Sequence, residues 1–148
     1  MSDAAAVRLL VFRVGSLACA ADVESVREIL PRLAVTRIPG APPVVAGLVN
    51  VRGQIVTVVE GWRALHQAAP QESDAGGTTM LLQVGGGRVL GFTVDEVLDL
   101  LAVPDAALER RDALPGVDPT LVRAVGRRAG QPFVVLDTDA LLGPILSS

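Results

Sequence analysis

The residues that could carry out chemistry in this chain of 148 residues are few. Cys19 is the single cysteine and His66 the single histidine, so this chain alone cannot assemble a Cys/His zinc site or an internal disulfide. Asp95 and Glu96 do not form a general-acid pair, because adjacent residues in a strand or helix point in different directions. The glycine run at 85–87 lacks the Lys-Ser/Thr of a phosphate loop. No nucleophile, base and orienting group come together, so an enzyme is the least favoured class.

One short polar corner offers a different kind of chemistry. Two apolar runs rich in β-branched residues, 44–51 and 54–59, flank the turn at Arg52-Gly53. β-Branched residues favour strands, and Gly53 accepts the positive φ that a tight hairpin turn requires. The predicted hairpin holds Asn50 and Arg52 at a defined corner of an apolar sheet. We interpret this corner as a recognition surface and not as a catalytic site.

Composition narrows the class of protein further. Half of the residues are apolar and 20% are charged, which is typical of a globular, core-forming domain. The net charge is −3 and aromatic residues make up 3%, so a small β-barrel that binds nucleic acid is disfavoured. The N-terminus lacks the basic region of a signal peptide, and no apolar run approaches the ~20 residues that span a bilayer. The sequence predicts a cytoplasmic protein without cofactor, metal or direct membrane insertion.

The elements that must position the polar corner are mostly short strands. Gly and Pro turns separate them, and a polar, small-residue linker is expected at 67–77. A short helix capped by Asp22 is expected after the second strand. The remaining expected elements are strands at 8–15, 17–21, 78–84, 88–94, 121–125 and 132–137, and helical segments at 62–65 and 139–146.

The two halves of the chain resemble each other. The pattern VxxVxEIL at 23–30 aligns with VDEVLDLL at 94–101, an offset of 71 residues. The turn at Gly53 aligns with that at Gly130, an offset of 77 residues. Such self-similarity predicts two copies of one small β unit. A unit of ~70 residues is marginally stable alone, so the copies should form two small barrels that pack together.

The repeat also isolates an exception at the turn. Where the first copy has Asn50 and Arg52, the second has Arg127 and Ala129, while both copies keep the glycine. A turn with a purely structural role would need only that glycine. Arg52 is therefore a better functional candidate than the hairpin that carries it.

The central run at 38–59, IPGAPPVVAGLVNVRGQIVTVV, resembles the CheW family of chemotaxis coupling proteins. Its Asn-x-Arg-Gly-x-Ile segment is the most specific part of that likeness. VREI at 26–29, VDEV at 94–97 and VVLD at 134–137 fall in the family's order. The likeness extends over nearly the whole chain, from about residue 8 to residue 142.

The resemblance implies a fold that agrees with the repeat. Members of the family are mainly β, with two SH3-like five-stranded barrels, short helices and a hydrophobic groove between the barrels. We therefore expect a single domain over 8–146, with barrel halves at about 8–66 and 78–146 joined by the linker at 67–77. Exchange of terminal strands between the halves is left open.

The resemblance also implies a function without catalysis. Family members bridge the cytoplasmic tip of chemoreceptors to the regulatory domain of the histidine kinase CheA, and other CheW-like domains are further possible partners. Such a protein would lie at the inner face of the membrane through its receptors. A groove could bury the apolar stripe of the receptor's helical hairpin, and Arg52 could pair with Glu28, which would orient its guanidinium. The receptor-binding residues carried over are Val26, Glu28, Ile29, Asn50, Arg52 and Val94.

This chain departs from the family pattern after the hairpin. Residues 57–61 read Thr-Val-Val-Glu-Gly, where the family has Pro-Val-x-Asp-Leu. The change removes an apolar anchor at the barrel edge, which Trp62 could replace. The alternative is therefore a divergent adaptor that binds receptors but not kinase, or that serves a pathway other than chemotaxis.

Overall fold

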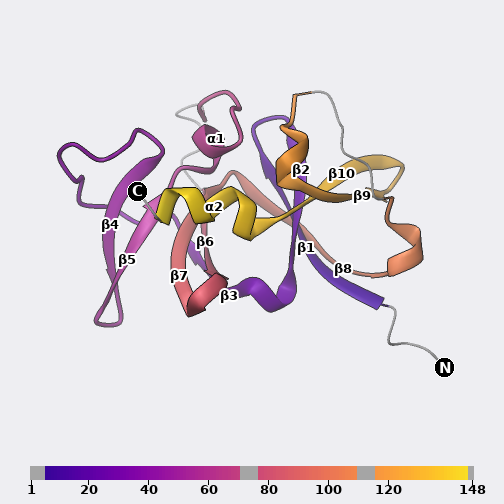
Figure 1. Cartoon of the computed structure of the whole chain (residues 1–148), viewed down its shortest axis with the longest axis horizontal. Helices are drawn as coiled ribbons and strands as arrows, with labels where there is room; N and C mark the ends of the chain where they lie inside the picture. The colour runs from indigo at the N-terminus through magenta and orange to yellow at the C-terminus, as the bar shows by residue number, and fades with distance from the viewer. Residues whose placement is uncertain (1–5, 71–76, 110–115, 147–148) are drawn as a thin grey trace.

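The computed structural model describes residues 6–70, 77–109 and 116–146, and the described chain is mainly β. It forms ten strands in two five-stranded sheets, which confirms the predicted fold class (Figure 1). We call these sheets barrel 1 and barrel 2. Barrel 1 has the order β3 (Val26–Pro31), β6 (Thr78–Val84), β7 (Arg88–Val94), β5 (Gln54–Val59) and β4 (Val45–Val51). Barrel 2 has the order β8 (Glu96–Pro104), β1 (Ala6–Val14), β2 (Leu17–Asp22), β10 (Gln131–Leu136) and β9 (Val122–Arg128).

The two barrels have the same topology. Adding five to each strand number of barrel 1, and counting β11 and β12 as β1 and β2, gives the order of barrel 2. The β5–β7 pairing of barrel 1 and the β10–β2 pairing of barrel 2 are parallel, and the other strand pairings are antiparallel. The two copies inferred from the sequence are thus visible as two copies of one sheet.

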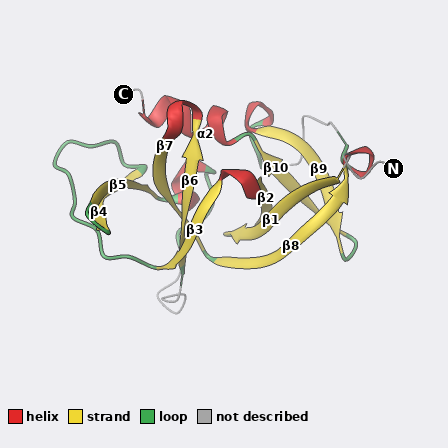
Figure 2. Ribbon diagram, turned by 90° about the horizontal axis from the view of Figure 1, so that it is seen from below, coloured by secondary structure: helices red, strands yellow, loops and turns green. Residues whose placement is uncertain are grey.

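The sheets do not follow the two halves of the sequence. Strands β1 and β2 belong to barrel 2, and strands β6 and β7 belong to barrel 1, so each half gives its first two strands to the other (Figure 2). The limits of 8–66 and 78–146 expected for the barrel halves are therefore not the limits of the sheets. Of the expected linker at 67–77, residues 71–76 lie outside the described ranges, and the domain bounds of 8–146 remain a prediction.

The segment after Asp22 differs from the expected short helix. A single 3-10 turn at Val23–Ser25 is followed directly by β3. Within β3, half-buried and exposed residues alternate, and the strand pairs with β6. The apolar residues that suggested helical spacing thus have the two-residue period of a half-buried strand. The two described α-helices are α1 (Gly61–Ala64) and α2 (Thr138–Leu146).

The core joins the two barrels. One cluster of buried side chains contains residues of β1, β2, β9 and β10 from barrel 2 and of β5, β6 and β7 from barrel 1. Phe12 and Phe92 meet edge to face inside it, with ring centroids 6.3 Å apart. Leu141 and Leu142 of α2, which crosses in front of β6 and β7 in Figure 1, also belong to this cluster. The interior where the barrels meet is packed with side chains, and the groove between the barrels stays a prediction.

Candidate recognition site

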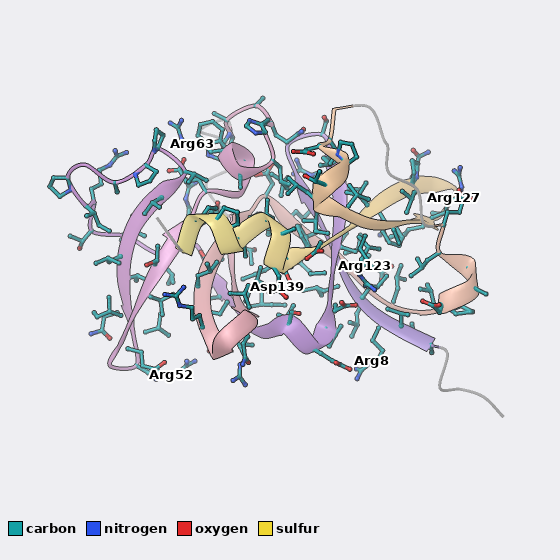
Figure 3. The ribbon with its side chains drawn as sticks, viewed as in Figure 1. Arg8, Arg52, Arg63, Arg123, Arg127 and Asp139 are labelled. Atoms are coloured by element: carbon teal, nitrogen blue, oxygen red, sulfur yellow. The ribbon has the colours of Figure 1, made fainter. Side chains whose placement is uncertain are left out.

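Glu28 and Arg52 form a bidentate ion pair at one edge of barrel 1. Arg52 Nη1 donates to Glu28 Oε1 at 2.7 Å, and Arg52 Nη2 donates to Glu28 Oε2. The Arg52 side chain is 67% exposed and that of Glu28 is 29% exposed. Figure 3 shows Arg52 at the end of the β4–β5 hairpin that points away from α1. The pairing of these two residues, expected from the resemblance, is present in the structure.

The fold explains why residues 24 positions apart in the sequence meet. Strands β3 and β4 are the two edges of the barrel 1 sheet, and Arg52 lies in the turn at the end of β4. The Glu28–Arg52 pair therefore links one edge strand to the hairpin at the other edge. We call such a link an edge clasp.

The turn itself sets the direction of Arg52. Arg52 has φ 49° and Gly53 has φ 84°, and positive φ at both central residues is the signature of the tight two-residue hairpin. The side-chain oxygen of Asn50 accepts a hydrogen bond of 2.8 Å from the Gly53 N–H. This hydrogen bond stabilises the turn that positions Arg52. The Asn50 side-chain oxygen is therefore already bonded within the hairpin.

Glu28 and Arg52 each stabilise the charged form of the other. The hydrogen bonds from Arg52 lower the pKa of Glu28, and the same bonds raise the pKa of Arg52. Both groups therefore remain charged at neutral pH. The two bonds use two of the five guanidinium N–H donors, and the remaining donors are open to a partner because the side chain is exposed.

Three apolar residues were predicted to accompany the pair, and the structure separates them. Ile29 is 46% exposed and follows Glu28 on β3. Val26 is half-buried against the shared core. Val94 is 3% exposed and belongs to that core, so it does not present a surface beside Arg52. β7 is a central strand whose inward residues are covered, and a role for Val94 in receptor binding stays a prediction.

A shallow hollow lies beside the ion pair. It has a volume of about 420 Å³ and is lined by Glu28 and Arg52 together with apolar residues of β4, β5, β6 and β7. Ile55, which is 64% exposed, is a neighbour of Gln54 at its rim. Ile55 was not among the predicted site residues, although an isoleucine on the outward face of a strand was a detectable signal. The apolar lining residues are Val51, Val56, Leu81 and Val89.

A second edge clasp is present in barrel 2. Arg128 Nε donates to Asp99 Oδ2 at 3.0 Å, which links β9 to β8 across the two edges of that sheet. Asp99 follows Glu28 by 71 residues, the same offset that aligns the two repeats. The next residue, Leu100, is 56% exposed and corresponds to Ile29. The recurrence of the acidic residue in the second copy was not among the predictions from the sequence, although the repeat alignment contains it.

The two clasps lie at opposite ends of the molecule. Figure 3 shows Arg52 at one end and Arg127, the neighbour of Arg128, at the other. Within the described residues, no three His, Cys, Asp or Glu side chains gather as metal ligands would. No helix in the described ranges is long and apolar enough to cross a membrane.

Comparison with known proteins identifies the family. The family model described as "CheW-like domain" matches residues 8–145. The chain belongs to the CheW family. Its predicted character as a non-enzymatic chemotaxis scaffold or adaptor is confirmed by this membership.

Individual members of the CheW family show the same relationship. The chain is 29% identical to a chemotaxis protein CheW of Rhizobium meliloti over 134 residues. This alignment covers 90% of this chain and 85% of the relative. Identity to the CheW of Bacillus subtilis is 26%, with 91% and 86% covered. Protein FrzA of Myxococcus xanthus is 33% identical over 95 residues, with 64% and 58% covered.

A solved CheW structure supports the fold independently. The scaffolding protein TtCheW from Thermoanaerobacter tengcongensis matches with a TM-score of 0.80 over 88% of each chain, at 18% identity. This likeness confirms the two-barrel SH3-like architecture that the sequence predicted. At this identity it bears on the fold alone.

Proposed function

We propose that this CheW-like chain couples the cytoplasmic tip of chemoreceptors to the regulatory domain of a CheA-type histidine kinase. It would then act in the cytoplasm, held at the inner face of the membrane through the receptors. The observation that carries the proposal is the edge clasp of barrel 1, together with the exposed Ile29 on the same strand as Glu28 and the exposed Ile55 on β5. This combination offers a partner both apolar surface and oriented guanidinium donors.

The chemistry of this surface suits a helical hairpin. An amphipathic helix presents apolar residues at intervals of three or four, which can pack against exposed apolar side chains such as Ile29 and Ile55. Arg52 is held by Glu28 in a fixed orientation, so little side-chain freedom is lost when its outward donors bind. The receptor-binding set that we carry forward is Glu28, Arg52, Ile29 and Val26, with Asn50 supporting the turn and Val94 supporting the core.

The substitution Arg52→Glu tests the proposal. It places a carboxylate opposite Glu28 and removes the donors, so receptor binding should weaken by about tenfold or more. The measurement is the affinity for a soluble receptor fragment that contains the tip, by calorimetry or NMR titration at tens of micromolar. The matched control is Arg8→Glu, which makes the same charge change at an exposed position on β1 of barrel 2 (Figure 3).

Thermal unfolding separates recognition from stability. Because the pair is exposed, both variants should melt within about 2 °C of the parent protein. A melting temperature that falls only in Arg52→Glu would assign the residue to barrel closure. Equal receptor affinity in both variants would remove the barrel 1 edge from the receptor site.

The alternative is an adaptor that binds receptors but not kinase. Its motive is the Glu60-Gly61 departure from the family pattern. A Cβ on Gly61 would lie 2.1 Å from the Thr93 carbonyl oxygen, so the leucine of the family pattern does not fit this backbone. A separate titration with the kinase regulatory domain decides between the two, because the alternative predicts receptor binding without kinase binding.

A further inference from the structure

A second hollow in barrel 1 lies away from the edge clasp. It has a volume of about 230 Å³ and lies between α1 and the segment that follows β3. Val58 and Val94, which are 1% and 3% exposed, contribute to its apolar lining. Val35 and Trp62, both half-buried, add to that lining. None of the residues of the Glu28–Arg52 pair lines it.

The charges around this hollow do not cancel. Its two carboxylates are already paired with arginines that do not line it: Glu60 accepts from Arg63 Nε at 3.0 Å, and Asp95 accepts from Arg13 Nη1 at 3.2 Å. The two arginines of the same hollow, Arg32 and Arg37, are exposed, and no hydrogen bond or ion pair is present for either in the described part of the chain. The rim therefore carries two cationic groups that are available to an anion.

The fold does not require these residues. The repeat places Val103 at the position of Arg32 and Asp139 at the position of Trp62. Barrel 2 forms the same sheet without an arginine or a tryptophan at these places. A cationic rim over an apolar hollow beside Trp62 is thus a property of the first copy alone.

The size of the hollow limits what can occupy it. Sites for cofactors and drug-sized ligands measure roughly 300–1,000 Å³, whereas this hollow matches one large apolar side chain. We propose that it docks a segment of a partner protein in which an apolar anchor residue is flanked by acidic residues. The anchor occupies the space beside Trp62, and the flanking carboxylates bind Arg32 and Arg37.

The single tryptophan of the chain makes this proposal testable. The probe is an acetylated hexapeptide, Asp-Glu-Leu-Leu-Glu-Asp, which carries no aromatic group to obscure Trp62. We expect it to shift Trp62 fluorescence and the Trp62 indole N–H signal, with a Kd of about 10⁻⁴ M. Because the contacts are charged and exposed, raising the salt from 50 to 300 mM should weaken binding about threefold. Two control peptides replace the acidic residues by lysine or the leucines by serine.

Three variants separate this site from the proposed receptor site. The double change Arg32→Glu and Arg37→Glu should weaken binding of the acidic peptide about tenfold or more, whereas Arg8→Glu should not. Arg52→Glu should also leave peptide binding unchanged, so this proposal can fail or hold independently of the proposed function. The proposal is overturned if 1 mM acidic peptide leaves the Trp62 signals unmoved, if the lysine peptide binds equally well, or if the double variant keeps full affinity.

Discussion

The edge clasp, an ion pair between the two edges of a sheet, occurs in both copies of the repeat. In barrel 1 the arginine lies in the hairpin turn and its side chain is 67% exposed. In barrel 2 the arginine is the last residue of β9 and its side chain is 38% exposed. Each arginine binds a carboxylate on the opposite edge strand, and in each case an exposed apolar residue follows that carboxylate.

Because the acid–arginine pair occurs in both barrels, only a feature found in one barrel is evidence of recognition. A link between opposite edges occurs in both barrels, so an acid–arginine pair at this place belongs to the architecture. The position of Arg52 one residue further into the turn, where it is more exposed, is particular to barrel 1. The pair alone is therefore weak evidence of function, and the greater exposure of the Arg52 guanidinium donors is the stronger evidence.

The largest effect is expected from exchanging the interiors of the barrels. The cross-strand pair Gly126 and Phe133 of barrel 2 corresponds to Val49 and Val56 of barrel 1. A Cβ on Gly126 would lie 2.5 Å from Phe133 Cζ, so Gly126→Val should cost roughly 2–4 kcal/mol. Phe133→Val should cost roughly 2–3 kcal/mol, because it leaves a cavity.

The double variant tests whether the pairs are interchangeable. It installs the barrel 1 pair in barrel 2, where each valine relieves the defect left by the other. Its loss should be smaller than the sum of the single losses by at least about 1 kcal/mol. Equilibrium unfolding in urea measures the loss of stability in the two single variants and in the double variant. If the loss in the double variant equals the sum of the two single losses, the valine pair of barrel 1 does not pack in barrel 2.

A smaller effect is expected at the two turns. Ala129 has φ 51°, a conformation that costs a residue with a Cβ but costs glycine little. No atom lies within 4 Å of a Cβ built on the neighbouring Gly130, so the turn of barrel 2 is open on that side. Ala129→Gly should raise the stability by roughly 0.5–1 kcal/mol. A melting temperature that rises by about 1–4 °C would agree, whereas a fall would show that the alanine side chain has a packing role.

The smallest change in stability is expected from the ionisation of the two clasps. Arg52 lowers the pKa of Glu28 through hydrogen bonds and charge. Arg128 lowers the pKa of Asp99 in the same way, and the Leu100 N–H lowers it further through a bond of 2.8 Å. Arg52→Gln should return the Glu28 pKa to its usual range, while Arg128→Gln should return that of Asp99 only in part.

NMR titration of the side-chain carboxyls measures both shifts. Because folding lowers these pKa values, each pair stabilises the protein above the unfolded-state pKa, and this contribution is lost as the pH falls through the folded-state pKa. The stability difference between parent and Arg52→Gln should therefore shrink below about pH 4. Complete recovery of the Asp99 pKa in Arg128→Gln would show that the backbone donor contributes nothing.

Local sequence patterns predicted individual elements well. The strands expected at 78–84 and 88–94 have those bounds in the structure, and the hairpin around Arg52-Gly53 forms as its β-branched flanks indicated. The short helix expected from Asp22 was wrong beyond Ser25, because pairing with β6 holds the following residues extended. The period of apolar residues in so short a segment did not distinguish the two outcomes.

Long-range relations were harder to predict. Strands β1 and β2 join the sheet of the second half, and β6 and β7 join that of the first half. This pairing depends on contacts between residues far apart in the sequence, which local patterns do not predict. Of the apolar residues predicted for the site, Ile29 is exposed, whereas Val94 is covered by the core that the two barrels share. The Asp99–Arg128 pair could have been found from the repeat, since its acidic residue aligns with Glu28.

The reciprocal exchange of strands has a consequence for the origin and assembly of the molecule. Each half of the chain supplies three strands to one barrel and two to the other, and the two contributions are equivalent. The same arrangement of strands describes a symmetric dimer of half-length chains in which each subunit completes its partner's sheet. The present protein is thus the covalent counterpart of a domain-swapped dimer. Because both copies lie in one chain, their surfaces can differ: Arg52 and Trp62 of the first copy align with Ala129 and Asp139 of the second.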